Sequence, residues 1–264
     1  MYIDTHLHLD EPWLANSEKR QKVIDDITAN KIITFAQSCD LTSYDKTLEW
    51  SKQPDYLFPS FGILPWFANE YMDRLDEVAD LCENAIMLGE IGLDLASNRN
   101  KSNKREQLAL LDVFLKAAEK HDMVVNLHFR GGIEPEGFEV LKSYSVKRAI
   151  FHWYSGTLEL MDEINDEGYY YSIGQINLAK RPKSMRERIA NMVLKIPDDR
   201  LLLEIDVLPK DMEKVPSVVF LGILEDMAEI KNTSVEEIEA LNQTNVQELV
   251  GNSSRVSGIT KLLK

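Results

Sequence analysis

The chain has 264 residues, of which 44% are hydrophobic and 28% charged, and 44 acidic against 30 basic residues give a formal net charge of −14. This composition is typical of a globular protein and excludes a disordered, collagen-like or coiled-coil chain. No apolar run approaches the roughly 20 residues of a membrane span, and the first residues lack a signal-peptide pattern, so we expect a cytoplasmic protein without membrane attachment. Two cysteines are too few for a disulfide framework.

Eight short apolar or β-rich runs alternate with amphipathic stretches along the chain. In order, the runs are Tyr2–His8, Ile32–Cys39, Leu57–Leu64, Ala85–Leu93, Met123–Phe129, Arg148–Trp153, Tyr169–Ile173 and Arg200–Asp206. Such nearly continuous apolar runs are typical of parallel strands that are covered on their outer face. Between two of them, Leu108, Leu111 and Leu115 lie on one face of a predicted helix. Further on, Ser234 and Glu237 have the spacing of a capping box.

This alternation predicts an α/β protein, a single-domain (β/α)8 TIM barrel that spans residues 1–264. The alternative is an open, doubly wound sheet, which also alternates strands and helices. That fold carries a glycine-rich turn after its first strand, whereas the first run here ends in His6-Leu7-His8. No Ser/Gly/Pro-rich linker divides the chain. The barrel is therefore the better interpretation.

Four of the five histidines lie in these predicted strands, at or near their carboxyl ends. His6 and His8 are two residues apart in one strand, so both imidazoles point to the same face. The other polar residues near strand ends are His128, His152, Glu90 and Asp206. In a barrel, the carboxyl ends of the strands form the face where catalytic residues gather. We therefore expect these side chains to meet.

Imidazole and carboxylate are the ligands that zinc and related divalent ions accept. Four histidines and two acids exceed what one tetrahedral ion needs, so a two-metal site with Glu90 or Asp206 as the bridge is expected. One histidine in an apolar strand is usually a core residue, but that reading does not explain so many in separate strands. His121 ends a predicted helix, where a cation suits the helix dipole, and we expect it to be structural.

In these residues and their spacing, the sequence resembles the TatD-type metal-dependent hydrolases. They are also known as the TatD-related deoxyribonuclease family and belong to the amidohydrolase superfamily. The matching segments run in family order over nearly the whole chain: Ile3–His8, Gly62–Trp66, Gly89–Asp94, Asn126–Arg130, Phe151–Gly156, Leu203–Asp206 and Asn245. The resemblance implies a (β/α)8 nuclease with two divalent metal ions, whose identity (Zn, Mg or Mn) stays open. The family activity is phosphodiester cleavage.

The resemblance also implies how the candidate ligands are used. Asp206 is expected to act as a general base as well as a ligand, and Glu90 to be shared between the ions. By the family pattern, one ion is held by His6, His8 and Asp206, and the other by His128 and His152.

Two departures from the family pattern concern the substrate. Leu64 stands where many members have a histidine near the substrate phosphate. After Asp206 the chain reads Val207-Leu208-Pro209, which differs from the usual family segment. All the metal positions are kept, so the departures leave hydrolysis as the expected reaction and leave its substrate open.

A nucleic-acid substrate needs cations against its phosphates, and stacking aromatic side chains help to bind single strands. The candidate substrate-binding residues are Arg130 and Lys180 as cations and Trp153 as an aromatic platform. Arg130 could equally orient a ligand carboxylate, and Lys180 could lie on a solvated loop. Because the whole chain is acidic, any DNA contact must come from a local patch.

We expect a hydrolase that cleaves phosphodiesters in DNA or a small phosphoester. One alternative is an amidohydrolase-type enzyme that uses the same residues on a small amide, ester or lactone. The other is a non-catalytic binding protein that retains its metal, against which Asp206 argues because a structural site needs no free base. No protein partner is predicted.

Overall fold

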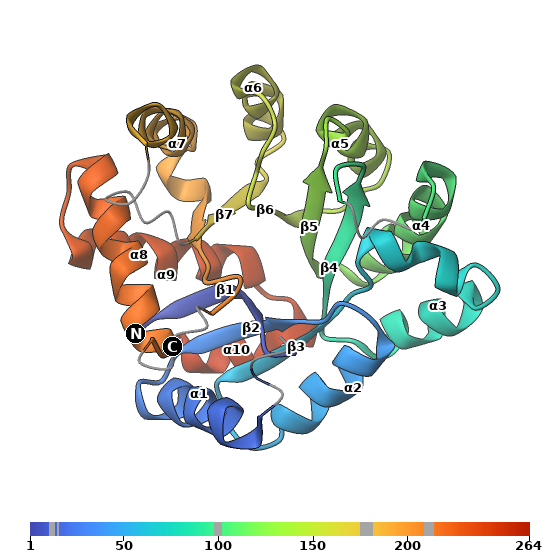
Figure 1. Ribbon diagram of the computed structural model, residues 1–264, viewed down its shortest axis with the longest axis horizontal. Helices are drawn as coiled ribbons and strands as arrows, with labels where there is room; N and C mark the ends of the chain where they lie inside the picture. Colours follow the sequence, from blue (N-terminus) through green and yellow to red (C-terminus); the bar gives the residue numbers. More distant parts are fainter. Residues whose placement is uncertain (11–13, 15, 98–101, 175–181, 209–213) are drawn as a thin grey trace.

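The protein is described by a computed structural model that covers residues 1–10, 14, 16–97, 102–174, 182–208 and 214–264. Eight parallel strands form one sheet in chain order (Figure 1). They are β1 (Ile3–His8), β2 (Ile33–Gln37), β3 (Leu57–Phe61), β4 (Met87–Asp94), β5 (Val124–Arg130), β6 (Arg148–His152), β7 (Tyr170–Ile173) and β8 (Leu201–Leu203). This order, with helices between the strands, confirms the predicted (β/α)8 barrel.

A ring of helices surrounds the strands (Figure 1). They are α1 (Ser17–Ala29), α2 (Leu41–Trp50), α3 (Leu75–Asn84), α4 (Lys104–His121), α5 (Glu134–Lys142), α6 (Leu158–Asp166), α7 (Lys183–Lys195) and α8 (Pro216–Lys231), followed by α9 (Val235–Val250) and α10 (Ser257–Leu262). The predicted capping box is confirmed at the start of α9, because the Ser234 hydroxyl accepts a hydrogen bond from the Glu237 backbone N–H and the Glu237 carboxylate accepts one from the Ser234 backbone N–H. Every helix in the described ranges is too short or too polar to cross a bilayer.

The barrel closes between its first and last strands by way of Asp206. The eighth strand was predicted to end at Asp206, but β8 ends at Leu203, and Asp206 forms an isolated parallel bridge with Leu7. The backbone N–H of His8 donates to the Asp206 carbonyl at 2.9 Å, and the N–H of Asp206 donates to the His6 carbonyl at 2.7 Å. Asp206 has a φ of 63°, a left-handed backbone conformation that does not continue an extended strand.

Asp4 strengthens the same seam from inside the protein. Its Oδ1 atom accepts the backbone N–H of His6 at 3.1 Å and that of Ile205 at 2.9 Å. Burial raises the pKa of the Asp4 carboxyl well above its usual range. One side chain thus ties β1 to the segment that carries Asp206.

Two hydrophobic clusters separate the barrel into an outer layer and a floor. The larger cluster lies between the strands and the surrounding helices. The smaller one joins the inward residues at the amino ends of the strands, such as Ile3, Ile33 and Ile150, to Val246 of α9 and Ile259 of α10. Because the last helices close this end, polar side chains inside the barrel gather at the opposite, carboxyl end.

Candidate metal centre

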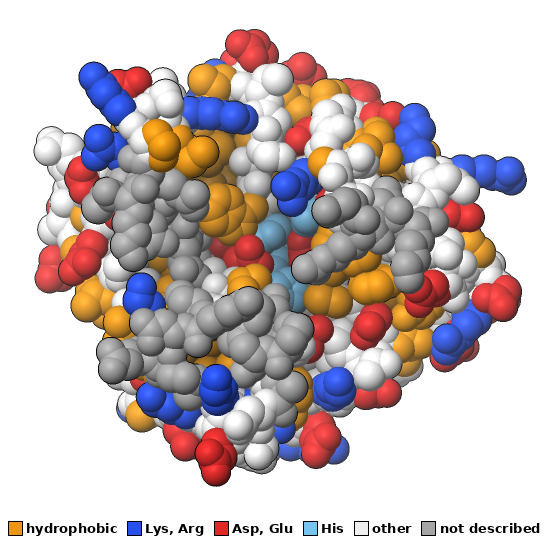
Figure 2. Space-filling view, viewed as in Figure 1, with side chains coloured by type: hydrophobic (Ala, Val, Ile, Leu, Met, Phe, Trp, Pro, Cys, Tyr) orange, Lys and Arg blue, Asp and Glu red, His pale blue; other side chains and the backbone are white. Residues whose placement is uncertain are grey.

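The six predicted ligand residues meet at the carboxyl end of the barrel. Figure 2 shows pale-blue histidines at the bottom of a central hollow, beside red acidic side chains. His6 and His8 come from β1, His128 from β5 and His152 from the end of β6. Glu90 lies inside β4 rather than at its end, because that strand continues to Asp94. Asp206 lies beyond β8, in the bridge with Leu7 described above.

The inner atoms of this set face one another. The two Nε2 atoms of His6 and His8 lie 3.0 Å apart, and Nε2 of His8 lies 3.0 Å from Oε2 of Glu90. The other carboxylate oxygen, Oε1, lies 2.5 Å from Nδ1 of His128 and 3.6 Å from Nε2 of His152. Glu90 therefore stands between the two pairs of histidines.

Three of the four histidines have a polar neighbour on the outer side that sets the direction of the ring. Nδ1 of His6 lies 2.9 Å from the amide oxygen of Asn126. Nε2 of His128 lies 3.0 Å from Oδ2 of Asp94. Nδ1 of His8 lies 3.6 Å from Asp10 and 3.5 Å from the Cys39 sulfur.

His152 differs in how it meets its outer carboxylate. Its Nδ1 atom lies 2.8 Å from Oε1 of Glu204, yet the two atoms are not aligned for a hydrogen bond. The other oxygen of Glu204 accepts a hydrogen bond from Ser172. Burial raises the pKa of the Glu204 carboxyl well above its usual range. The ring of His152 is instead held by stacking on His6, with a centroid distance of 3.7 Å.

Four groups in the described residues have ligand atoms within 4.8 Å of one another. Two of these groups are the ones that the family resemblance implies. The first is His6 with His8 and Asp206, and the second is Glu90 with His128 and His152. The remaining groups combine inner histidines with their outer neighbours: His6, His152 and Glu204, and His8, Asp10 and Cys39.

The donor set fits divalent ions. A neutral imidazole has one N–H and one lone pair, so a ring whose outer nitrogen donates to an acceptor points its lone pair inward. Asn126 provides such an acceptor for His6, and Asp94 provides one for His128. With neutral rings, the inward lone pairs and the Glu90 carboxylate repel one another unless a positive charge, either a proton on His128 or a metal ion, lies between them.

The carboxylates of the site differ in their proton affinity. Burial disfavours the charged form of Glu90, but the positive charges of His128 and His152 outweigh it and hold its pKa well below the usual range. Asp206 lies at the solvent-facing side of the candidate metal centre, with 30% of its side chain exposed. Its partial burial, opposed by the histidines, raises its pKa to about 6. Asp206 is thus the carboxylate better suited to take up and release a proton near neutral pH.

Two glycines allow the strands to approach closely at the site. A Cβ atom on Gly92 would lie 1.9 Å from the backbone oxygen of His128. A Cβ atom on Gly62 would lie 2.2 Å from the backbone nitrogen of Glu90. Any larger residue at either position would push a candidate ligand out of place, which gives a physical reason for glycine in both segments.

The structure locates two of the three predicted substrate-binding residues. Arg130 is exposed and is the last residue of β5, two positions beyond His128. Trp153 directly follows β6 and is half-buried, and its indole Nε1 is buried without a hydrogen-bond partner in the described ranges. Lys180 lies outside the described residues.

Two residues noted in the sequence also lie near the centre. The ring of Trp66 meets His128 edge to face at a centroid distance of 5.7 Å, so it forms part of the wall. Leu64, which departs from the family pattern, is 4% exposed, and its N–H donates to the Cys39 carbonyl. The predicted structural role of His121 agrees with its partly buried contact to Glu83, at 2.5 Å between Nε2 and Oε2.

The sequence interpretation missed the outer neighbours Asp94, Asn126, Glu204 and Asp10, although the first three lie in segments that match the family. Their signal is a polar residue in an apolar strand close to a predicted ligand. Asn126 precedes His128 by two residues, and Glu204 precedes Asp206 by two. A buried polar residue at such a position needs a partner, and the nearest candidate is a histidine from a neighbouring strand.

A (β/α)8 barrel with histidine and carboxylate groups gathered at the carboxyl ends of its strands has an architecture suited to a metal-dependent hydrolase. The chain belongs to the TatD related DNase family, whose sequence model matches residues 3–251. This confirms the resemblance drawn from the motifs and the expectation of a hydrolase.

Individual relatives agree with this family. The chain is 27% identical over 244 residues to an uncharacterized metal-dependent hydrolase of Methanocaldococcus jannaschii, covering 90% of this chain and 92% of the relative. It is 30% identical over 203 residues to the 3'-5' ssDNA/RNA exonuclease TatD of Dickeya dadantii, covering 72% and 70%. The crystal structure of YjjV, a TatD homologue from Escherichia coli, has the same fold, with a TM-score of 0.78, 23% identity and coverage of 94% and 97%.

Proposed function

We infer that this chain is a divalent-metal-dependent phosphodiesterase that acts on single-stranded nucleic acid or a small phosphoester, with residues 1–264 as one catalytic domain. The observation that carries the proposal is the position of Glu90 between two histidine pairs, since one carboxylate with an oxygen toward each pair suits two ions. Relatives named as ssDNA/RNA exonucleases support a nucleic-acid substrate.

The proposed ligands follow the two groups described above. His6, His8 and Asp206 hold one ion, His128 and His152 hold the other, and Glu90 is shared. Zinc, magnesium and manganese are all candidates, because a site of mixed histidine and carboxylate ligands accepts each of them according to availability. When bound, divalent ions supply positive charge that acidifies an attacking water and offsets negative charge on phosphoryl oxygens.

The protein's own groups supply the remaining steps. Asp206 accepts a proton from the attacking water and returns it to the leaving oxygen, a role that suits its raised pKa. Glu90 keeps its negative charge and fixes the spacing of the two histidine pairs. Arg130 neutralises phosphate at the end of β5, and Trp153 and Lys180 are the further substrate contacts in this proposal.

The decisive experiment assays one protein preparation against substrates that differ in the bond to be hydrolysed. A 5′-labelled single-stranded oligonucleotide, a small phosphodiester, a lactone and an anilide are assayed with magnesium, manganese and zinc in turn. We expect both phosphodiesters to be cleaved. His128→Asn should lower the rate by about 10²-fold or more, since it removes a ligand, whereas His121→Asn is the matched control and should leave the rate unchanged.

The outcome also separates the alternatives. Turnover of the lactone or anilide without phosphodiester cleavage would make this chain an amidohydrolase-type enzyme acting on a small molecule. Metal binding without turnover of any substrate would make it a binding protein that retains its metal.

A further inference from the structure

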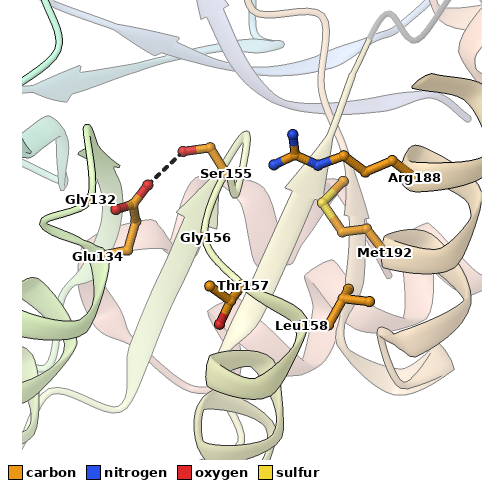
Figure 3. A pocket seen from close by; sticks show the side chains of 8 residues that line it. All are labelled: Gly132, Glu134, Ser155, Gly156, Thr157, Leu158, Arg188 and Met192. Atoms are coloured by element: carbon orange, nitrogen blue, oxygen red, sulfur yellow. Dashed lines mark hydrogen bonds between the residues drawn. The ribbon is translucent and has the colours of Figure 1, made fainter. Parts of the chain in front are cut away.

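A cavity of about 410 Å³, a size within the range of small-molecule sites, is lined in part by the segments that follow the strands of His128 and His152. It lies between the segments that follow β5 and β6 and one face of α7 (Figure 3). Its lining residues are Gly132, Glu134, Ser155, Gly156, Thr157, Leu158, Arg188 and Met192.

The cavity is connected to the metal centre by two short segments. Ser155 lies three residues beyond His152, and Gly132 lies four residues beyond His128. Three residues of extended chain span at most about 11 Å and four at most about 14 Å, so the backbone of Ser155 and of Gly132 lies within that distance of the candidate ligands His152 and His128. A substrate whose reacting bond lies at the metal centre can therefore place its neighbouring group in this cavity.

One wall of the cavity presents a buried carboxylate. Glu134 is the first residue of α5 and is 5% exposed. Its Oε1 atom accepts a hydrogen bond from the Ser155 hydroxyl at 2.9 Å (Figure 3). In the described part of the chain, no lysine or arginine lies within ion-pair distance of Glu134. Buried carboxylates are rare unless they are paired, so this group is suited to N–H donors from a ligand.

The opposite wall, formed by α7, presents a cation and apolar atoms. Arg188 and Met192 face Glu134 and Ser155 across the cavity, and Leu158 lies at its base (Figure 3). Arg188 is exposed and makes no ion pair within the described ranges. Its planar guanidinium can stack on a flat ring, and methionine and leucine side chains pack against the same kind of ring.

We propose that this cavity binds an unpaired nucleobase, with guanine preferred, of the strand that is cleaved at the metal centre. The inference rests on the proposed function, because it deepens the nucleic-acid substrate of the same site. The base stacks on Arg188 and Met192 and turns its hydrogen-bonding edge to Glu134.

Guanine is preferred because of its donor pattern. Its Watson–Crick edge carries an N1–H and an amino group side by side, which two carboxylate lone pairs can accept. Thymine has one N–H between two carbonyl oxygens, which a carboxylate repels. Adenine has one amino group beside a ring nitrogen that accepts. A good bidentate pair discriminates between bases by roughly tenfold or more.

The test uses the metal-loaded protein and the dinucleotides TpG, GpT and TpT. Cleavage rates give kcat/KM, and binding is measured by calorimetry with the Asp206→Asn protein, which keeps the cavity intact. We expect at least one guanine-containing dinucleotide to bind about tenfold more tightly than TpT. Equal binding of all three by this protein would overturn the proposal.

Two pairs of variants identify the groups that recognise the base. Glu134→Gln should abolish the guanine preference, while Glu136→Gln, on the same helix and 2.9 Å from Lys104 on the surface, should keep it. Arg188→Lys retains the positive charge but loses the planar guanidinium, so it should weaken binding of every dinucleotide. The control Arg186→Lys should not weaken it. A guanine preference that survives Glu134→Gln, or tight binding of every dinucleotide that survives Arg188→Lys, would also overturn the proposal.

Failure of this proposal differs from failure of the proposed function. Cleavage of all three dinucleotides at one rate, unchanged by Glu134→Gln, leaves a phosphodiesterase without this base site. If guanine-dependent binding requires Glu134 but the protein cleaves none of the dinucleotides, the base site is supported and the proposed phosphodiesterase activity is excluded.

Discussion

His128 is held between two carboxylates, with its Nε2 atom 3.0 Å from Oδ2 of Asp94 and its Nδ1 atom 2.5 Å from Oε1 of Glu90. The outer carboxylate is itself fixed, because Oδ1 of Asp94 accepts the backbone N–H groups of Ala96 and Ser97 at 2.7 and 2.8 Å. A chain of contacts thus runs from the loop after β4 through the ring of His128 to the shared carboxylate Glu90.

Weakening this chain should lower metal affinity without unfolding the protein. Asp94→Asn keeps an oxygen for the loop N–H groups but loses the charge that orients His128. We expect metal affinity to fall by about 10–100-fold, the usual effect of removing an outer partner of a ligand. Competition titration with a chromogenic chelator measures it, with the exposed Asp45→Asn as control. Equal affinity in both variants would mean that Asp94 does not orient a ligand.

Loss of the proposed general base should reduce turnover far more than stability. Asp206→Asn keeps the backbone hydrogen bonds that close the barrel, since these come from the main chain. We expect kcat to fall by about 10²-fold or more, the scale of general-base catalysis, with an unchanged circular dichroism spectrum. Steady-state assays on a small phosphodiester test this, and full turnover by the variant would exclude Asp206 as the base.

The purified protein should carry one to two equivalents of divalent metal, because two ligand groups share Glu90. Chelation should lower the melting temperature, since a ligand at about 100 times its Kd stabilises the native state by roughly 2.7 kcal/mol. Elemental analysis and thermal unfolding before and after reloading with zinc, manganese or magnesium measure both effects. Protein that binds none of these ions after reloading would contradict the metal centre.

The metal-free protein should lose stability as the pH rises from about 6.5 to 9. Burial opposes the charged form of His128, but Glu90 and Asp94 outweigh it and raise the pKa of His128 to about 9. A raised histidine pKa adds stability that is complete below the unfolded value of about 6.5 and is lost as the pH rises through the folded value.

We expect this loss to be on the order of 1–3 kcal/mol in the free energy of unfolding. Urea titrations of chelated protein at several pH values measure it, and His128→Asn should flatten the curve over this interval. An identical pH profile in the variant would assign the effect to another group.

Long nucleic-acid strands should bind little better than short ones. The chain carries a formal charge of −14, and the cations assigned to the substrate here are Arg130, Lys180 and Arg188. Single strands give a salt slope of about −0.7 per phosphate contact, so we expect a slope of log affinity against log salt no steeper than about −2. Fluorescence anisotropy with dinucleotides and longer strands at several salt concentrations tests this, and a much steeper slope would require a basic groove elsewhere.

The sequence predicts the barrel because each apolar run has the length of a buried strand and is followed by a helical face. It also predicts which histidines meet, since His6 and His8 share a strand face and the others lie near strand ends. It could not predict that β8 ends at Leu203 or that Asp206 has a left-handed backbone, because both depend on how the last segment meets the neighbouring strands.

The outer neighbours escape a strand-by-strand interpretation for a similar reason. Asn126 reaches His6 across the barrel, a contact between residues 120 positions apart. The cavity lined by Glu134 and Arg188 likewise depends on α7 lying against the segments after β5 and β6. Periodicity within one element carries no information about such distances between elements.

The bridge between Leu7 and Asp206 joins β1 to the segment that follows β8. The residue that closes the sheet is also the proposed ligand and base, so the site is assembled only when the final strand has docked on the first. A folding intermediate that lacks this seam would contain most of the histidines and yet be unable to hold the first ion or move the proton. A chain that has not yet made this bridge would therefore lack the proposed hydrolase activity, even with the rest of the barrel formed.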